Sequence, residues 1–102
     1  MNDTVHDALV RVAREDSGQV VALLARRFGD LDLADDAVQD ALAEAISRWP
    51  HTGVPANPAG WLHTAARRKA IDRLRRRASA DRRIRAAAPE LVALDEPFVA
   101  GA

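Results

Sequence analysis

Ten cationic side chains lie between Trp61 and Arg85, against only two acids, Asp72 and Asp81. They are Arg67, Arg68, Lys69, Arg73, Arg75, Arg76, Arg77, Arg82, Arg83 and Arg85. The net charge of the whole chain is zero, so this basicity is local. Cations at this density bind phosphate groups and release the counterions that surround a polyanion. The segment therefore predicts a phosphate-binding surface, although on a small domain a basic helix end is about as often a solvated face.

The first 60 residues carry the opposite bias, with ten acids against five arginines. Asp36, Asp40 and Glu44 recur at intervals of four residues, which places them on one face of a helix. An acidic face is repelled by a polyanion and suits a basic protein surface, although without other context it is more often only solubilising. The charge distribution thus suggests two partners of opposite charge.

The sequence contains no constellation typical of an enzyme or of a metal site. His6, His51 and His63 are not spaced to place two ligands on one helical face, and the chain has no cysteine. No serine lies in a nucleophile elbow, and no glycine-rich loop could cradle a phosphate. We therefore expect a non-enzymatic module with no catalytic residue, cofactor or metal.

Apolar residues recur at helical intervals almost throughout, which predicts an all-α fold. We expect a compact bundle of three main helices plus a short N-terminal helix over residues 5–14, capped by Thr4 or Asp3. The polar cluster at residues 15–18 should break that helix. Asp16 and Gln19 then resemble a capping box for a second helix, which should end at Gly29.

The third helix should be capped by Asp32 and end before Pro50, and the fourth should run from Pro58, behind an Asn57 cap, to about Arg77. The third helix carries an apolar stripe of Ala34, Ala37, Val38, Ala41, Leu42, Ala45, Ile46 and Trp49. On the fourth, the ridge of Leu62, Ala66, Ala70 and Leu74, flanked by Trp61 and Ala65, is the candidate core contact. The predicted core comprises Leu23, Leu24, Phe28, Val38, Leu42, Ile46, Trp49 and Leu62.

The chain length predicts one small domain. We place it at residues 1–85 and expect a linker or disordered tail over residues 86–102, which contain two prolines and no useful amphipathic face. The sequence has neither a secretory leader nor an apolar run of about 18 residues. We therefore expect a cytoplasmic protein that makes no membrane contact.

The string Asp36-Ala37-Val38-Gln39-Asp40 lies on an acidic helix that ends at Trp49. After a short loop, Trp61-Leu62 opens a helix that continues with the string AIDRLRR at residues 70–76. The order of these features resembles the second conserved region of extracytoplasmic-function (ECF) sigma factors of bacterial RNA polymerase. The resemblance covers about residues 16–78.

This resemblance implies that the acidic helix binds the clamp helices of the β′ subunit in the RNA polymerase core. The loop and the fourth helix would bind the −10 element of promoter DNA on the non-template strand and capture an unpaired base. The implied polymerase-binding residues are Asp36, Gln39, Asp40 and Glu44. The implied DNA-binding residues are His51, Asn57, Trp61, Thr64, Arg67, Arg68, Arg75 and Arg76. Among these, Asn57 is best suited to a base edge and the arginines to phosphates, whereas Trp61 suits the core better than a DNA wedge.

A second hypothesis is a helical protein-interaction domain, either a sigma-like decoy or a docking module, that does not bind DNA. ECF sigma factors carry a second domain that reads the −35 element, and this sequence stops before one begins. We expect either an N-terminal fragment or a natural protein that lacks this contact. The sequence leaves open whether an anti-sigma factor also binds.

Overall fold

A computed structural model describes residues 3–94, with side chains for residues 3–87. The chain forms α1 (Asp3–Arg11), a π-helical turn (Val12–Asp16), α2 (Ser17–Phe28), α3 (Leu31–Thr52) and α4 (Pro58–Leu94). No strand occurs in this part of the chain, so the predicted all-α fold is confirmed. None of the described helices is long and apolar enough to cross a membrane.

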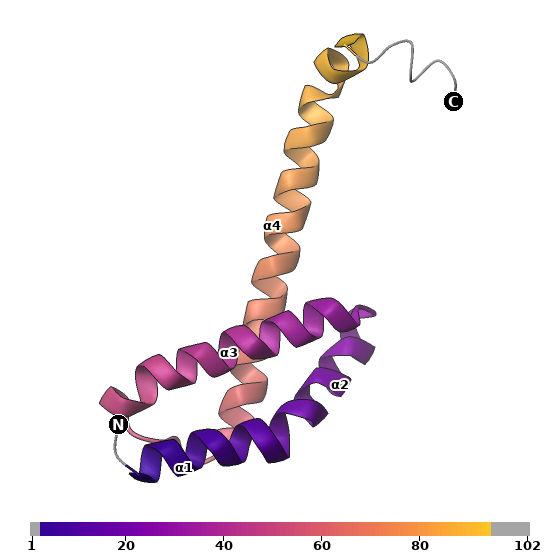
Figure 1. Ribbon diagram of the computed structural model, residues 1–102. Coiled ribbons are helices and arrows are strands. Elements are labelled where there is room, and N and C mark those ends of the chain that lie inside the picture. The colour runs from indigo at the N-terminus through magenta and orange to yellow at the C-terminus, as the bar shows by residue number, and fades with distance from the viewer. Residues whose placement is uncertain (1–2, 95–102) are drawn as a thin grey trace.

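Helices α1 and α2 are joined without the predicted break. The Ser17 amide reaches back five residues to the Val12 carbonyl, and the Ser17 hydroxyl donates a hydrogen bond to the Ala13 carbonyl. The chain changes direction between α1 and α2 at this wide turn (Figure 1). The expected capping box is wrong, because the Asp16 side chain makes no cap hydrogen bond. Asp3 and Thr4 both lie within α1 rather than before it.

The ends of α2 and α3 follow capping chemistry. Gly29 adopts a left-handed conformation (φ 68°) that favours glycine, and its amide donates to the Ala25 carbonyl at 2.8 Å, as a C-terminal cap does. The N-cap of α3 is Asp30 and not the predicted Asp32: its Oδ1 accepts a hydrogen bond from the Leu33 amide at 2.9 Å.

Pro50 lies inside α3, although the sequence predicted a helix that ends before it. Proline cannot donate to the carbonyl four residues earlier, but α3 needs only two more residues to reach Thr52. The Gly53 amide then caps α3 by donating to the Trp49 carbonyl at 2.9 Å.

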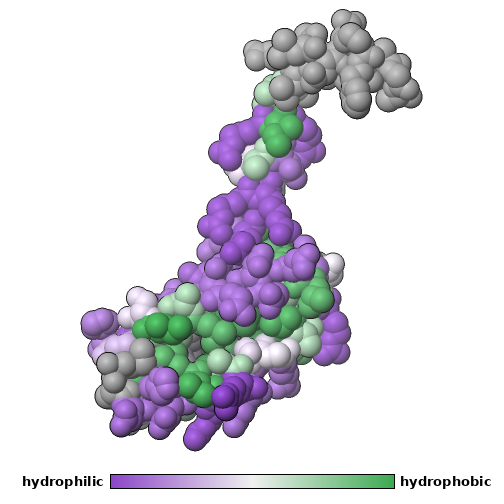
Figure 2. Space-filling model, viewed as in Figure 1, coloured by the Kyte–Doolittle hydropathy of each residue, from purple (hydrophilic) through white to green (hydrophobic). Residues whose placement is uncertain are grey.

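Helix α4 is much longer than predicted and continues across the expected boundary at residue 85 as far as Leu94. Its first half crosses α3, and its second half projects out of the bundle as a largely hydrophilic rod (Figures 1 and 2). The chain accordingly extends over 62 × 27 × 16 Å. Residues 86–94 are thus helical, whereas the rest of the predicted tail lies outside the described residues.

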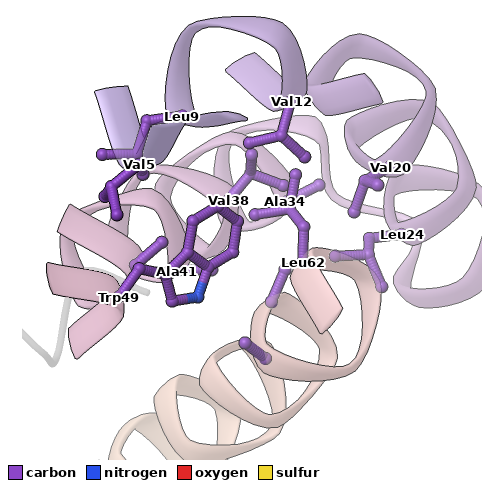
Figure 3. Packing of buried hydrophobic residues seen from close by; sticks show 13 residues of the cluster. Val5, Leu9, Val12, Val20, Leu24, Ala34, Val38, Ala41, Trp49 and Leu62 are labelled. Atoms are coloured by element: carbon purple, nitrogen blue, oxygen red, sulfur yellow. The ribbon is translucent and has the colours of Figure 1, made fainter. Parts of the chain in front are cut away.

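The core lies where α1, the π turn and α2 pack against α3 and α4 (Figure 3). Trp49, Leu24, Leu33, Leu62, Val12 and Val38 are the largest fully buried side chains. The predicted ridge of α4 is confirmed at Leu62, Ala66 and Ala70, which are buried as is the flanking Ala65, whereas Leu74 is only partly buried. Two predicted core residues are wrong: Leu23 is 42% exposed and Ile46 is 53% exposed. Phe28 and Leu42 are only partly buried at the edge of the core.

Candidate functional site

The acidic face of α3 is paired with cations from α4. Asp40 accepts two hydrogen bonds on Oδ2 from Arg73, from Nε at 2.9 Å and from the NH2 nitrogen at 2.7 Å. The NH1 nitrogen of Arg73 lies 3.7 Å from Asp36 Oδ2. Arg73 therefore pairs two of the predicted polymerase-binding carboxylates on α3 with α4.

Glu44, one turn further along α3, lies among three cations. Arg68 approaches it at 3.5 Å, Lys69 at 3.3 Å and Arg48 at 3.9 Å. The Glu44 side chain is 20% exposed, and these three cations largely compensate its charge within the domain. Gln39 is exposed and Asp36 keeps 54% of its side-chain surface, so these two residues present this face to solvent.

Sequence reasoning did not identify Arg73 and Lys69 as partners of the acidic face. Arg73 is 33 residues from Asp40. Helical spacing predicts pairs only three or four residues apart. The sequence did contain a signal for this pairing. Arg73 and Lys69 both flank the core ridge of α4, on the side that faces α3.

On α4, four of the predicted DNA-binding residues share one shallow hollow of about 350 Å³. Thr64, Arg67, Arg68 and Arg75 line it together with His63, Ile71 and Asp72. Arg75 is 79% exposed, and its NH1 nitrogen lies 4.0 Å from Asp72 Oδ1, a weak and solvent-exposed ion pair. The hollow combines guanidinium groups with a hydroxyl, which suits the phosphates and sugars of a nucleic acid.

The remaining predicted residues lie elsewhere. Arg76 is exposed but does not line the hollow, and His51 is exposed near the end of α3. Asn57 is the predicted N-cap of α4, and its Oδ1 accepts a hydrogen bond from the Gly60 amide at 3.0 Å. A Cβ atom on residue 60 would come within 2.7 Å of Asn57 Nδ2, so any other residue there would require the Asn57 side chain to shift.

Trp61 is partly buried against Trp49, and the two rings meet edge to face with centroids 5.3 Å apart. Trp49 is only 1% exposed, and its indole nitrogen has no hydrogen-bond partner in the described part of the chain. The pair joins the end of α3 to the first turn of α4 and holds the 53–57 loop between them. This packing favours the core interpretation of both tryptophans.

A further ion pair ties α4 to the start of α3. The NH1 nitrogen of Arg77 lies 3.1 Å from Asp30 Oδ2. The hydrogen bond from the Leu33 amide, followed by the one from Arg77, lowers the pKa of the Asp30 carboxyl. Asp30 thus acts both as a helix cap and as an anchor for α4. Within the described residues, no group of three or more His, Cys, Asp or Glu side chains could hold a metal ion.

Comparison with known proteins assigns a family to this arrangement. The sigma-70 region 2 family matches residues 12–80, from the π turn to the middle of α4. The chain belongs to this family, a class of non-enzymatic transcription factor domain, and the predicted sigma resemblance is confirmed.

The chain is also similar to an uncharacterized protein of Rhizobium meliloti (strain 1021), with 45% identity over 58 residues. This similarity covers 57% of the chain but only 14% of the relative. No solved structure matches the chain.

Proposed function

We propose that this domain acts in transcription initiation, as region 2 of an ECF sigma factor, by binding both the RNA polymerase core and the −10 element of promoter DNA. The observation that carries this proposal is the family match, which spans the acidic face of α3 and the cationic face of α4 together. Each face has the charge that its proposed partner requires.

The polymerase-binding surface in this proposal is the face of Asp36, Gln39, Asp40 and Glu44. Gln39 and Asp36 make first contact with the basic clamp helices of the β′ subunit because they are the exposed members. Asp40 and Glu44 are paired with cations of α4, and this pairing fixes the orientation of α3 beneath the exposed members.

A pull-down with a β′ clamp-helix fragment tests this surface. Gln39→Arg and Asp36→Arg should each weaken capture because they place a cation against a basic partner. Asp40 is a poorer probe, since reversing its charge also disrupts the Arg73 pair. Asp7→Arg on α1 is the matched control, because it changes charge at an exposed position outside the face. Equal capture of all folded variants would eliminate the proposed surface.

The DNA-binding surface combines the α4 hollow, exposed Arg76, and the loop region with His51, Asn57 and Trp61. The arginines bind phosphates of the non-template strand, and the loop region takes an unpaired base. Binding by the domain alone should be weak, because one helix neutralises few phosphates and the acidic body repels the strand.

Fluorescence anisotropy over a salt series tests this second surface. Arg75→Ala should lower the affinity for every single strand alike and reduce the log–log salt slope by about 0.7. Arg26→Ala on α2 removes an exposed arginine outside the hollow and should leave both quantities nearly unchanged. If no single strand bound at low salt, even with the clamp fragment present, the protein-docking hypothesis would replace DNA binding. A competing anti-sigma factor would be detected by its effect on clamp capture.

A further inference from the structure

The second half of α4 projects from the bundle and carries two cations that the family match leaves without a role (Figure 1). Arg82 and Arg85 lie beyond residue 80, where the match to sigma-70 region 2 ends. Both side chains are exposed, and neither forms an ion pair within the described part of the chain. Unpaired guanidinium groups held away from an acidic body are well placed to bind an anion. We refer to these two residues as the rod cations.

The rod cations continue a row that begins in the α4 hollow. Arg68, Arg75 and Arg82 recur every seven residues, close to two helical turns, so the three side chains lie in line along one face of α4. Arg68 and Arg75 line the hollow, and Arg82 follows about 10 Å further along the helix axis. Arg85 lies about one turn beyond Arg82. The row therefore leads out of the hollow and along the rod.

The cations that hold α4 against α3 lie on another side of the helix. Lys69, Arg73 and Arg77 recur every four residues, and each forms an ion pair with a carboxylate of α3. Arg82 lies about 140° around the helix from Arg77. The rod cations are therefore not used in packing the two helices, and they remain available to a partner.

The surface between Arg75 and Arg82 is open to a strand of phosphates. The side chains that flank this line are those of Ala78 and Ser79, which are small, and a serine hydroxyl can itself donate to a phosphate. Asp81, the acid beside the rod cations in the sequence, lies about 100° around the helix from Arg82. A single row of cations along a straight helix fits one phosphate backbone, whereas a duplex presents two.

We infer that the single strand held in the α4 hollow continues along the rod, where Arg82 and Arg85 bind its phosphates. The hollow, from His63 to Arg75, spans about 18 Å of helix, and the row to Arg85 extends this length to about 33 Å. At about 3.4 Å per nucleotide, these lengths correspond to about five and about ten nucleotides. This inference rests on the proposed binding of single-stranded promoter DNA and adds a second segment to the path of the strand.

The test compares fluorescein-labelled strands of six and twelve thymidines, bound to the full chain and measured by anisotropy over a salt series. The shorter strand covers only the hollow, and the longer strand also reaches the rod cations. For the wild-type chain, the log–log salt slope should be steeper by about 1.4 with the longer strand, because two further contacts contribute about 0.7 each. The double variant Arg82→Ala, Arg85→Ala should abolish this difference and leave the slope of the shorter strand unchanged.

Arg83→Ala is the matched control for Arg82→Ala. Arg83 is the adjacent residue and is also exposed, but it lies about 100° around the helix from Arg82. With the longer strand, Arg82→Ala should reduce the slope by about 0.7, whereas Arg83→Ala should leave it nearly unchanged. Far-ultraviolet circular dichroism establishes that each variant keeps its helix content, which alanine favours.

Three results would overturn the inference and leave the proposed DNA binding in place. They are equal slopes for the two strands with the wild-type chain, equal effects of Arg82→Ala and Arg83→Ala, and an effect of Arg82→Ala that is confined to a duplex of twelve base pairs. Absence of binding to either strand at low salt, even with the clamp fragment present, would overturn both the inference and the proposed DNA binding.

Discussion

The pairing of Arg73 with Asp40 gives a sharp test of how α3 is held against α4. The double-mutant cycle Arg73→Ala, Asp40→Ala and the double variant isolates the interaction of the two side chains. Alanine is a good helix former, so helix propensity contributes little to the result. Arg68 and Glu44 offer a second cycle, in which the same two helices are joined by a longer contact.

The structure sets the expected magnitudes. Arg73 donates two hydrogen bonds to one carboxylate oxygen, and the side chains of Arg73 and Asp40 are only 31% and 38% exposed. A charge-assisted hydrogen bond contributes about 1.5–3 kcal/mol when sheltered, while an exposed ion pair contributes about 0.2–1 kcal/mol. At this partial exposure we expect a coupling energy of about 1–2 kcal/mol. Arg68 is 57% exposed and 3.5 Å from Glu44, so its cycle should give less than about 0.5 kcal/mol.

Urea unfolding of the full chain, followed by circular dichroism, measures each free energy. The slopes of the four curves in a cycle should agree, since no variant changes the surface exposed on unfolding by much. A coupling below about 0.3 kcal/mol for Arg73 and Asp40, or equal couplings in the two cycles, would refute the reasoning from geometry and exposure.

Three further predictions follow from burial, capping and the shared cation. Leu62→Ala should lower the free energy of unfolding by about 2–5 kcal/mol, whereas Ile46→Ala should lower it by less than about 1 kcal/mol, because Leu62 is 0% and Ile46 53% exposed. Urea unfolding measures both losses, and equal losses would contradict the assignment of Leu62 to the core. The lowered pKa of Asp30 stabilises the fold above the ordinary value of 3.8, and this contribution is lost as the pH falls from that value through the lowered pKa of the folded state. The wild-type advantage over Asp30→Asn in unfolding curves should therefore be constant above about pH 5 and shrink below it; an advantage that stays constant on acidification would exclude this role. Glu44→Gln releases Arg68 from its ion pair and so should raise the affinity of the chain for single-stranded DNA and steepen the log–log salt slope by about 0.7. In the same fluorescence-anisotropy assay, the control Asp32→Asn should leave the slope unchanged.

The sequence predicted those parts of the fold that depend on local chemistry. Gly29 and Asn57 cap the helices that they were expected to cap, because a left-handed glycine and an asparagine before proline act through neighbouring backbone groups alone. The Asp32 prediction missed by two residues, since Asp30 offers the same cap one half-turn earlier. The low helix propensity of residues 15–18 predicted a break. Burial of Val12 and Val20 on either side outweighs that propensity, so the chain continues through a π turn, which local propensity alone could not predict.

Burial and pairing across helices were harder to predict. Ile46 has the helical spacing of a core residue, but an apolar stripe is wider than the contact it makes, and Ile46 is 53% exposed at the edge of a hollow that it lines together with residues of α1. Arg73 is one of the ten cations of the basic segment, and the crossing of α3 and α4 places it on Asp40, a pairing that helical spacing alone does not predict. Within the candidate DNA site, Thr64, Arg67, Arg68 and Arg75 line one hollow because their helical spacing places them on one face of α4, although only the resemblance to ECF sigma factors implied that they bind DNA.

Arg68 belongs to both proposed surfaces, and this links them. Its guanidinium lies 3.5 Å from Glu44 on the acidic face, while its side chain also lines the α4 hollow. A basic partner that binds beside Glu44 competes with Arg68 for the same carboxylate and so makes the guanidinium available to a phosphate in the hollow. By thermodynamic linkage, a strand that draws Arg68 away from Glu44 must in turn favour the basic partner by the same factor. Because the exposed pair is weak, each step would cost little, and on the proposed function the two bindings would reinforce one another through this side chain.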